Sequence, residues 1–322
     1  MSSSELHTLQ LLAQEMRDYA SQTELYWLQE LKRIMPDLQH QTVLESEIVT
    51  FYSPFRNVVI DIISCQHDHP DAYWLAWKRK ENFKLNYHYL SLEEERISKD
   101  TNFAYQEINK LLAQSLLIKV CGMRVPENIE AVMNLKPDML GFIHYSPSKR
   151  DVGQHFTMPT LPDTIRKVGV LVNESTENIE LACTKNHINT LQLHGKESIE
   201  QCNELKAKGY FIIKVFSVDD DFNFDETLPY LAVADLFLFD TKGKEHGGNG
   251  VRFNWDVLEK YHGQKPMLLS GGIGVNEAKK VLSMDLLKLN IAGIDVNSAF
   301  EISPANKNID LLNELFQSYN RI

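Results

Sequence analysis

The sequence contains few cysteines, and no two of them are close together. Only four occur in 322 residues: Cys65, Cys121, Cys183 and Cys202. This spacing excludes a dense disulfide framework and is typical of a protein in a reducing compartment. The first residues, MSSSELHTLQLLAQEM, have neither a basic start nor an uninterrupted apolar core, so we expect no signal peptide. Together these features predict a cytoplasmic protein.

The sequence also lacks long apolar runs and an excess of positive charge. No stretch is long and apolar enough to cross a bilayer. With 33 Lys and Arg against 44 Asp and Glu, the net charge is −11. That charge argues against nucleic acid or an anionic membrane as the main partner. A small anionic substrate is compatible with it, because a single loop can be positive within an acidic protein.

The length favours two domains. Apolar residues at helical spacing predict a helix within 5–35, which Pro36 ends. Ser91 and Glu94 form a capping box that predicts a helix over Leu90–Gln114. Between these helices we expect a small antiparallel sheet, which gives an α+β domain over residues 1–115 with no recognisable motif. Its predicted strands are Ser46–Tyr52, Asn57–Ser64, Ala72–Lys78 and Lys84–Tyr89.

Residues 116–322 follow a different pattern, in which apolar strands alternate with amphipathic helices. Eight such strands indicate a (β/α)8 TIM barrel, because alternating strands and helices produce parallel strands with right-handed crossovers. The alternative is an open doubly wound sheet, but its G-x-G-x-x-G fingerprint is absent after the first strand. The predicted strands are 117–121, 138–143, 168–172, 189–193, 211–216, 234–239, 266–269 and 291–296. The predicted helices are 126–134, 176–186, 197–208, 223–231, 254–261, 275–282 and 308–319.

The second barrel helix is poorly supported by the sequence. Gly153, Pro159 and Pro162 interrupt the segment between the second and third strands. We therefore expect that helix to be reduced to a turn around Pro162–Ile165.

Chemically active side chains stand where the barrel strands end, and in such barrels these ends face the active site. Cys121 ends the first strand and Asp240 ends the sixth, on opposite sides of the predicted mouth. A thiolate can remove a proton from carbon and a carboxylic acid can donate one to oxygen, so the pair suits an isomerisation. The alternatives are a small buried thiol for Cys121 and a helix cap or an ion pair with Lys242 for Asp240.

Two loops indicate a phosphate site. LLSGGIG, with Gly271 and Gly272, runs from the seventh strand into a helix, and IDVNSAF follows the same course after the eighth strand. Glycines there let backbone N–H groups approach an anion, and these are the loops that hold phosphate in many such barrels. The alternative is that the glycines only form a tight turn.

Seven segments in this order resemble phosphoribosylanthranilate isomerase of tryptophan biosynthesis, over about residues 117–322. They are KVCGM, GFIHYSPSKR, GVLVNES, LQLHG, LFDTKGKEHGGNGVRFNW, LLSGGI and IDVNSAFE. The resemblance implies an Amadori rearrangement of a phosphosugar substrate without a cofactor or metal. It further implies that Cys121 is the general base, that Asp240 is the general acid and that Arg150 holds the anthranilate carboxylate. The residues expected to bind substrate are Arg150, His194, Gly248, Gly271, Gly272, Asp295, Asn297 and Ser298.

Several positions depart from the usual family pattern. Asn297 and Ala299 stand where serine and glycine are more common, His246 where tyrosine is frequent, and His144 where phenylalanine is usual. We interpret His144 as a packed strand residue, with substrate contact as the alternative. Cys65, His67 and His69 in CQHDH could in principle bind a metal. Without a distant fourth ligand, however, we interpret the segment as a polar turn.

Two alternative functions remain at this stage. A related isomerase of the histidine pathway uses two aspartates as acid and base, and Cys121 argues against it. The barrel could also serve as a ligand-sensing or partner-binding module, against which the intact acid, base and phosphate loops argue. The N-terminal domain could mediate formation of a homodimer or docking on another tryptophan-pathway enzyme, and the sequence does not decide between them.

Overall fold

The computed structural model describes residues 39–43, 48–53, 58–64, 86–92, 113, 116–241, 254–261, 265–286 and 288–320. The chain divides into two compact units, Met1–Ser115 and Leu116–Ile322. Within the described ranges, no helix has both the length and the apolar character needed to cross a membrane.

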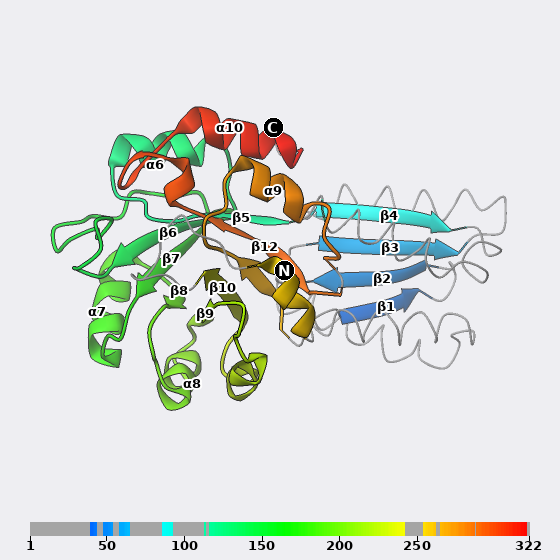
Figure 1. Ribbon diagram of the computed structural model, residues 1–322, viewed down its shortest axis with the longest axis horizontal. Helices are drawn as coiled ribbons and strands as arrows, with labels where there is room; N and C mark the ends of the chain where they lie inside the picture. Colours follow the sequence, from blue (N-terminus) through cyan, green and yellow to red (C-terminus); the bar gives the residue numbers. More distant parts are fainter. Residues whose placement is uncertain are drawn as a thin grey trace. The chain divides into compact units, whose positions relative to one another are not determined.

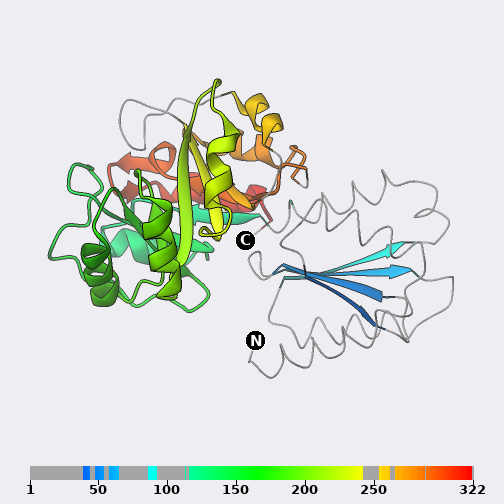
Figure 2. The same ribbon diagram turned by 90° about the horizontal axis from the view of Figure 1, so that it is seen from below.

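The first unit contains a mixed four-stranded sheet (Figure 2). Strand β1 (Gln39–Val43) pairs antiparallel with β2 (Ile48–Ser53), which pairs antiparallel with β3 (Val58–Ser64). Strand β4 (Asn86–Leu92) pairs parallel with β3. The expectation of an antiparallel sheet is therefore wrong at this last pair. Parallel pairing requires a long crossover between the two strands, and residues 65–85 supply the necessary length.

Two further expectations for this unit are corrected. β1 had not been predicted at all, and Ser91 lies inside β4, so no helix begins there. The aromatic residues of NYHYLSL favour a strand, and pairing with β3 extends that strand through Ser91 to Leu92. The helix predicted within 5–35 and the strand predicted over Ala72–Lys78 lie outside the described residues.

The second unit is a closed barrel of eight parallel strands, as predicted (Figure 1). Strand β12 closes it by pairing with β5, with Gly293 opposite Leu117 and Val296 opposite Val120. The strands follow the cyclic order β10-β11-β12-β5-β6-β7-β8-β9. Their bounds are β5 Leu117–Val120, β6 Met139–His144, β7 Arg166–Leu171, β8 Thr190–Leu193, β9 Phe211–Val218, β10 Leu236–Thr241, β11 Met267–Leu269 and β12 Ile291–Val296.

Helices connect these strands on the outside of the barrel (Figure 1). The fifth and sixth connections are 3-10 helices, and Pro229 lies inside the first of them, where it lacks the backbone donor of a regular α-helix. The second connection is a turn in which the Ile165 amide donates to Pro162 O at 2.9 Å, as expected from its prolines. The helices are α6 Pro126–Met133, α7 Thr176–Asn186, α8 Ile199–Ala207, η1 Phe224–Tyr230, η2 Trp255–Lys260, α9 Val275–Val281, η3 Ser298–Phe300 and α10 Ile309–Ser318.

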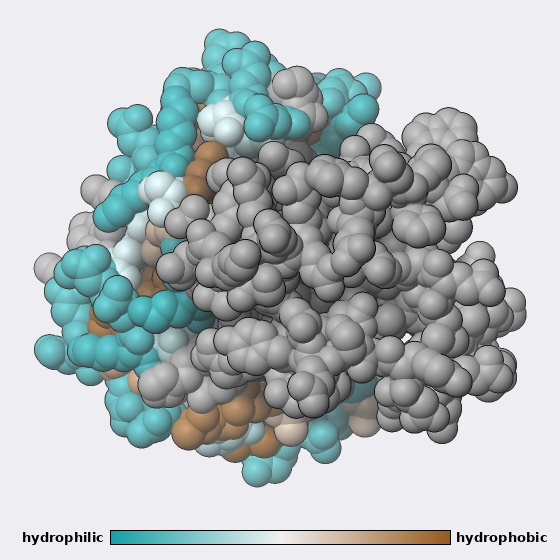
Figure 3. Space-filling model, turned by 90° about the vertical axis from the view of Figure 1, so that its right-hand side faces the viewer, coloured by the Kyte–Doolittle hydropathy of each residue, from teal (hydrophilic) through white to brown (hydrophobic). Residues whose placement is uncertain are grey.

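Side-chain caps and strand burial explain why these segments form these elements. Ser175 and Ser198 accept hydrogen bonds from the first turns of α7 and α8. All six residues of β10 and all six of β12 are buried, as expected for strands of a barrel covered by helices. The described surface visible in Figure 3 is largely hydrophilic, with apolar side chains in small patches.

Candidate active site

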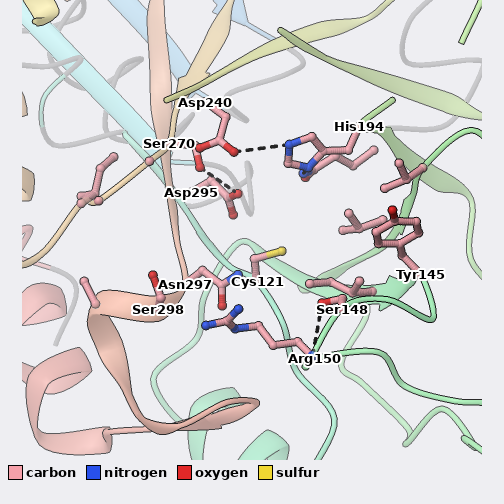
Figure 4. Close-up of a pocket in the computed structure, with 18 residues that line it drawn as sticks. Cys121, Tyr145, Ser148, Arg150, His194, Asp240, Ser270, Asp295, Asn297 and Ser298 are labelled. Atoms are coloured by element: carbon pink, nitrogen blue, oxygen red, sulfur yellow. Dashed lines mark hydrogen bonds and ion pairs between the residues drawn. The ribbon is translucent and has the colours of Figure 1, made fainter. Parts of the chain in front are cut away.

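The strand ends of the barrel converge on one pocket (Figure 4). Apolar side chains, among them Ile143, Val170 and Ile273, form part of its wall. Nine of the ten site residues predicted from the sequence line it, and the tenth, Gly248, lies outside the described residues. The nine are Cys121, Arg150, His194, Asp240, Gly271, Gly272, Asp295, Asn297 and Ser298.

Cys121 follows β5, and its amide donates to Val296 O at 2.9 Å, which fixes the end of the strand against β12. The residue is buried, and its thiol points into the middle of the pocket (Figure 4). Burial raises the pKa of the thiol, and the nearby Lys119 ammonium opposes that rise without cancelling it. The geometry therefore combines a shielded thiol with a neighbouring positive charge.

Gly122 makes room for two other pocket residues. Its φ is +74°, in the left-handed region that favours glycine. A Cβ at this position would lie 2.7 Å from Asn297 Oδ1 and 2.8 Å from Arg150 Cδ. The glycine after the cysteine therefore lets both side chains pack beside the thiol.

A buried ion pair lies below the thiol, and sequence reasoning missed it. Lys119 Nζ is 2.8 Å from Asp295 Oδ1, and both side chains are almost completely buried. Ser270 Oγ donates to the other oxygen of Asp295 at 3.4 Å. In the sequence, Lys119 is the one charged residue of the apolar first strand, and sequence reasoning assigned it no role. Its position two residues before Cys121 is the signal that it shares a face of the strand with the thiol.

Asp240 is the penultimate residue of β10 and lies beside a histidine. His194 Nε2 lies 3.3 Å from Asp240 Oδ2, and the Thr241 amide donates to Asp240 Oδ1 at 3.0 Å. Gln192 Nε2 lies 3.5 Å from the other ring nitrogen of His194. The carboxyl group is thus held from two sides while it faces the pocket. Lys242, the alternative partner of Asp240, lies outside the described residues.

Arg150 belongs to an ionic network that sequence reasoning also missed. Its guanidinium contacts Glu301 through Nε and Nη2, with the closest approach at 2.7 Å. Glu301 lies on β13 (Glu301–Ser303), directly across from Lys307 on β14 (Asn306–Lys307). Burial raises the pKa of Glu301, but Arg150 and Lys307 together hold that pKa below its usual range.

The two loops predicted to bind phosphate lie next to each other. Gly271 and Gly272 follow β11 with φ of +86° and +64°, so the chain turns through conformations that other residues adopt rarely. Asn297 and Ser298 follow β12 and line the same pocket. Lys307 Nζ donates to Asn297 Oδ1 at 2.7 Å, which orients the Asn297 side chain.

His144 lies on the other face of β6. Its neighbours Ile143 and Tyr145 line the pocket, and side chains alternate along a strand, so His144 is directed away from the pocket. Burial lowers the pKa of His144 and thereby favours the neutral ring. His246 and the CQHDH segment lie outside the described residues. Among the residues that are described, no group of three side chains could hold a metal ion.

A family model for N-(5'-phosphoribosyl)anthranilate (PRA) isomerase matches residues 118–318, which are nearly all of the barrel. This chain belongs to the PRA isomerase family. The N-(5'-phosphoribosyl)anthranilate isomerase of Phocaeicola vulgatus is 43% identical over 192 residues, which are 60% of this chain and 92% of that protein. The first 115 residues lie outside the family match.

Solved PRA isomerases have the same barrel. The enzyme from Thermotoga maritima superimposes with a TM-score of 0.55 at 27% identity, over 64% of this chain and all of that chain. Another PRA isomerase was solved in complex with reduced 1-(o-carboxyphenylamino)-1-deoxyribulose 5-phosphate. It has a TM-score of 0.53 at 24% identity and covers 64% of this chain and 100% of its own. At that identity the second likeness supports the fold alone.

Proposed function

We propose that this PRA isomerase converts N-(5-phospho-β-D-ribosyl)anthranilate into 1-(2-carboxyphenylamino)-1-deoxy-D-ribulose 5-phosphate, with Asp240 as general acid and Cys121 as general base. The observation that carries the proposal is that these two groups face one pocket from β5 and β10. Family membership supports the overall reaction, and the chemistry of the two side chains supports their roles.

Asp240 acts first. Its carboxylic acid donates a proton to the ring oxygen of the ribose, the bond from C1 to that oxygen breaks, and the lone pair of the anthranilate nitrogen forms an iminium. His194, 3.3 Å from Asp240 Oδ2, keeps the carboxyl group turned toward the pocket. This step opens the sugar and leaves a positively charged C1=N bond that can accept electrons.

Cys121 then acts as the base. Its thiolate removes the proton from C2, and the electrons of that C–H bond form a C1=C2 bond as the iminium becomes a neutral enamine. The enol at C2 becomes the ketone of the product. One proton has been given to oxygen and one removed from carbon, so the reaction is an isomerisation that requires no external oxidant or reductant. We therefore propose that it proceeds without a cofactor.

The remaining pocket residues bind the two ends of the substrate. We assign the phosphate to Gly271, Gly272, Asn297 and Ser298, because loops after the last two strands of a barrel commonly hold phosphate. Arg150 binds the anthranilate carboxylate, since a planar guanidinium can hold a carboxylate through two hydrogen bonds.

Two further pocket residues and Gly248 complete the binding set. His194 and Asp295 belong to it because both line the same pocket. Gly248, outside the described residues, stays a prediction. The assignments of His194 and Asp295 follow from their positions in the barrel and from the chemistry of their side chains, and that of Gly248 follows from the family resemblance.

We further propose that the enzyme works in the cytoplasm and that residues 116–322 are the catalytic domain. The α+β domain over residues 1–115 is an addition to the family barrel, and we assign it to self-association or to docking on another tryptophan-pathway enzyme. We assign substrate binding to the barrel, because every described residue that lines the pocket belongs to Leu116–Ile322.

The purified full chain should convert PRA when it is supplied without metal or cofactor, and chromatography should detect the carboxyphenylamino-deoxyribulose product. Competition with the substrate of the related histidine-pathway isomerase should leave this turnover unchanged. Absence of product from folded protein would contradict the proposal, and so would inhibition by the histidine-pathway substrate at concentrations near those of PRA.

A further inference from the structure

Lys119 and Cys121 share one face of the first barrel strand. Lys119 lies in β5, and Cys121 follows directly after the strand, two residues further along, so their side chains point to the same side, which is the interior of the barrel. Lys119 is fully buried, and Asp295 on the neighbouring strand pairs with it at 2.8 Å. A lysine is therefore held directly below the thiol that the proposed reaction uses.

Gly141 shows how close the two groups are. A Cβ at this position would lie 2.7 Å from Cys121 Sγ and 3.0 Å from Lys119 Nζ. Because both atoms lie close to this one position, the sulfur and the nitrogen are also close to each other. Their separation is within the ~4–6 Å over which an opposite charge stabilises an ionised group. Because Gly141 has no side chain, nothing separates the ammonium from the thiol at this point.

We propose that Lys119 is a positioning residue for the base: held by Asp295 inside the barrel, its ammonium stabilises Cys121 as a thiolate. The inference rests on the proposed function, since it concerns the same base. Lys119 contacts neither the reacting carbon nor the ring oxygen in this account. It acts only through the charge state and the orientation of Cys121.

Charged groups on several elements face Cys121. Burial raises the pKa of the thiol; against this, Lys119 lowers the pKa most, Asp295 raises it again, and Lys307 of β14 lowers it. Arg150, His194 and Asp240 line the same pocket from other loops and strands. Lys119 is thus the principal group that counteracts the burial of the thiol.

Lys119 remains charged although it is buried. Burial lowers its pKa, but Asp295 and Cys121 more than offset this, and the net effect raises the pKa above its ordinary value. A buried ion pair seldom adds net stability compared with apolar residues of similar size, because both charges lose their hydration. A role in the chemistry of Cys121 is a physical reason for its presence.

The test is a titration of the thiolate, followed by its ultraviolet absorbance, in the full chain without substrate. Subtracting the same titration of the matching Cys121→Ser protein isolates Cys121 from the other cysteines. Lys119→Met should raise the titration midpoint of Cys121 by at least about one pH unit. Asp295→Asn should lower the midpoint, because it removes a negative charge and leaves the ammonium uncompensated.

A second buried pair provides the control. Lys214 Nζ lies 2.8 Å from Glu197 Oε2 on the other side of the barrel, and neither residue lines the pocket. Lys214→Met also removes a buried lysine, but it should leave the midpoint of Cys121 where it is. A merely structural role of Lys119 would not produce opposite shifts in the Lys119 and Asp295 variants.

The inference is overturned if Lys119→Met leaves the midpoint unchanged or if the two variants shift it in the same direction. If Lys119→Met does not fold, as circular dichroism would reveal, Asp295→Asn decides, and a midpoint that does not fall overturns the inference. The titration needs no turnover. Opposite shifts without conversion of PRA would therefore contradict the proposed function alone, and conversion without the shifts would contradict this inference alone.

Discussion

Arg150 holds Glu301 through two guanidinium nitrogens, with Nε 2.9 Å from Oε1 and Nη2 2.7 Å from Oε2. The same Oε1 accepts a hydrogen bond from Lys307 Nζ at 2.7 Å, and Lys307 also donates to Asn297. One carboxylate thus joins the residue proposed to bind the anthranilate carboxylate to the loop proposed to bind phosphate. The two ends of the substrate site are positioned by a single network.

Glu301→Gln should weaken substrate binding more than catalysis. Loss of the negative charge leaves Arg150 and Lys307 as neighbouring cations without their shared partner, so Arg150 loses its fixed orientation. We expect KM to rise about tenfold, equivalent to about 1.4 kcal/mol, while kcat changes by less than about threefold. Steady-state kinetics with PRA measures both quantities.

Glu314→Gln is the matched control for that change. Glu314 pairs with Lys279 at 2.9 Å, but both side chains are about half exposed, and such a pair contributes little. Its kinetics should equal those of the unmodified chain. Equal KM values for the two glutamine variants would contradict the role given to Glu301.

Gly122→Ala should reduce activity because of crowding as well as backbone strain. The new methyl group would approach Asn297 Oδ1 and Arg150 Cδ, while Gly153, which has nearly the same φ of +76°, has no atom within 4 Å of its Cβ position. Both alanine variants should lose about 1 kcal/mol or more of stability from the left-handed backbone. Only Gly122→Ala should also lose most of its kcat/KM; similar kinetics of the two variants would show that crowding has no effect.

The free energy of unfolding should fall at alkaline pH because of two buried cysteines. Burial raises the pKa of Cys183 to about 12 and that of Cys202 to about 11, whereas both ionise near ~8.5 in the unfolded chain. The pKa values of both thiols are higher in the folded than in the unfolded chain. Their contribution to the free energy of unfolding is therefore complete below pH ~8.5 and is lost as the pH rises through ~11–12.

Urea unfolding at neutral and alkaline pH measures this loss. The unmodified chain should lose more stability with rising pH than the Cys183→Ala, Cys202→Ala double variant, which has no thiols to ionise at these sites. Parallel pH profiles for the two proteins would indicate that these cysteines have no part in the alkaline loss.

The barrel should be active without the N-terminal unit. All described pocket residues lie in Leu116–Ile322, and the family match begins at residue 118. A truncated chain that begins near Gln114 should therefore keep kcat/KM within about threefold of the full chain. A loss of more than about tenfold from folded protein would assign the N-terminal unit a part in catalysis. The masses of both proteins in solution would show whether that unit drives self-association.

The barrel could be predicted from the sequence because its signals are local and regular. Apolar runs such as LFLFDT of β10 are buried on both faces and are typical of strands, and amphipathic helix patterns alternate with them along the chain. Pocket residues such as Cys121 and Asp240 could be predicted because strand ends meet at one mouth in this architecture. A residue at the end of a predicted strand could therefore be assigned to the pocket from its place in the sequence.

Other features depended on contacts that the sequence does not encode locally. Glu301 and Lys307 are six residues apart in sequence, yet their meeting with Arg150 requires the turn between β13 and β14 and the loop after β6, which lies two strands from β12 around the barrel. The ion pair of Lys119 with Asp295 forms only when β12 closes on β5. The parallel pairing of β3 with β4 likewise depends on a crossover rather than on the residues of the strands.

The turnover of Cys121→Ser and Asp240→Asn tests the acid–base assignment most directly. Each variant should fold and should bind the reduced product analogue, measured by calorimetry, within about tenfold of the unmodified chain. Each should lose about 10²–10⁴-fold in kcat with PRA, the usual contribution of a positioned acid or base. A kcat within about threefold of the unmodified chain for either variant would contradict the role given to that residue.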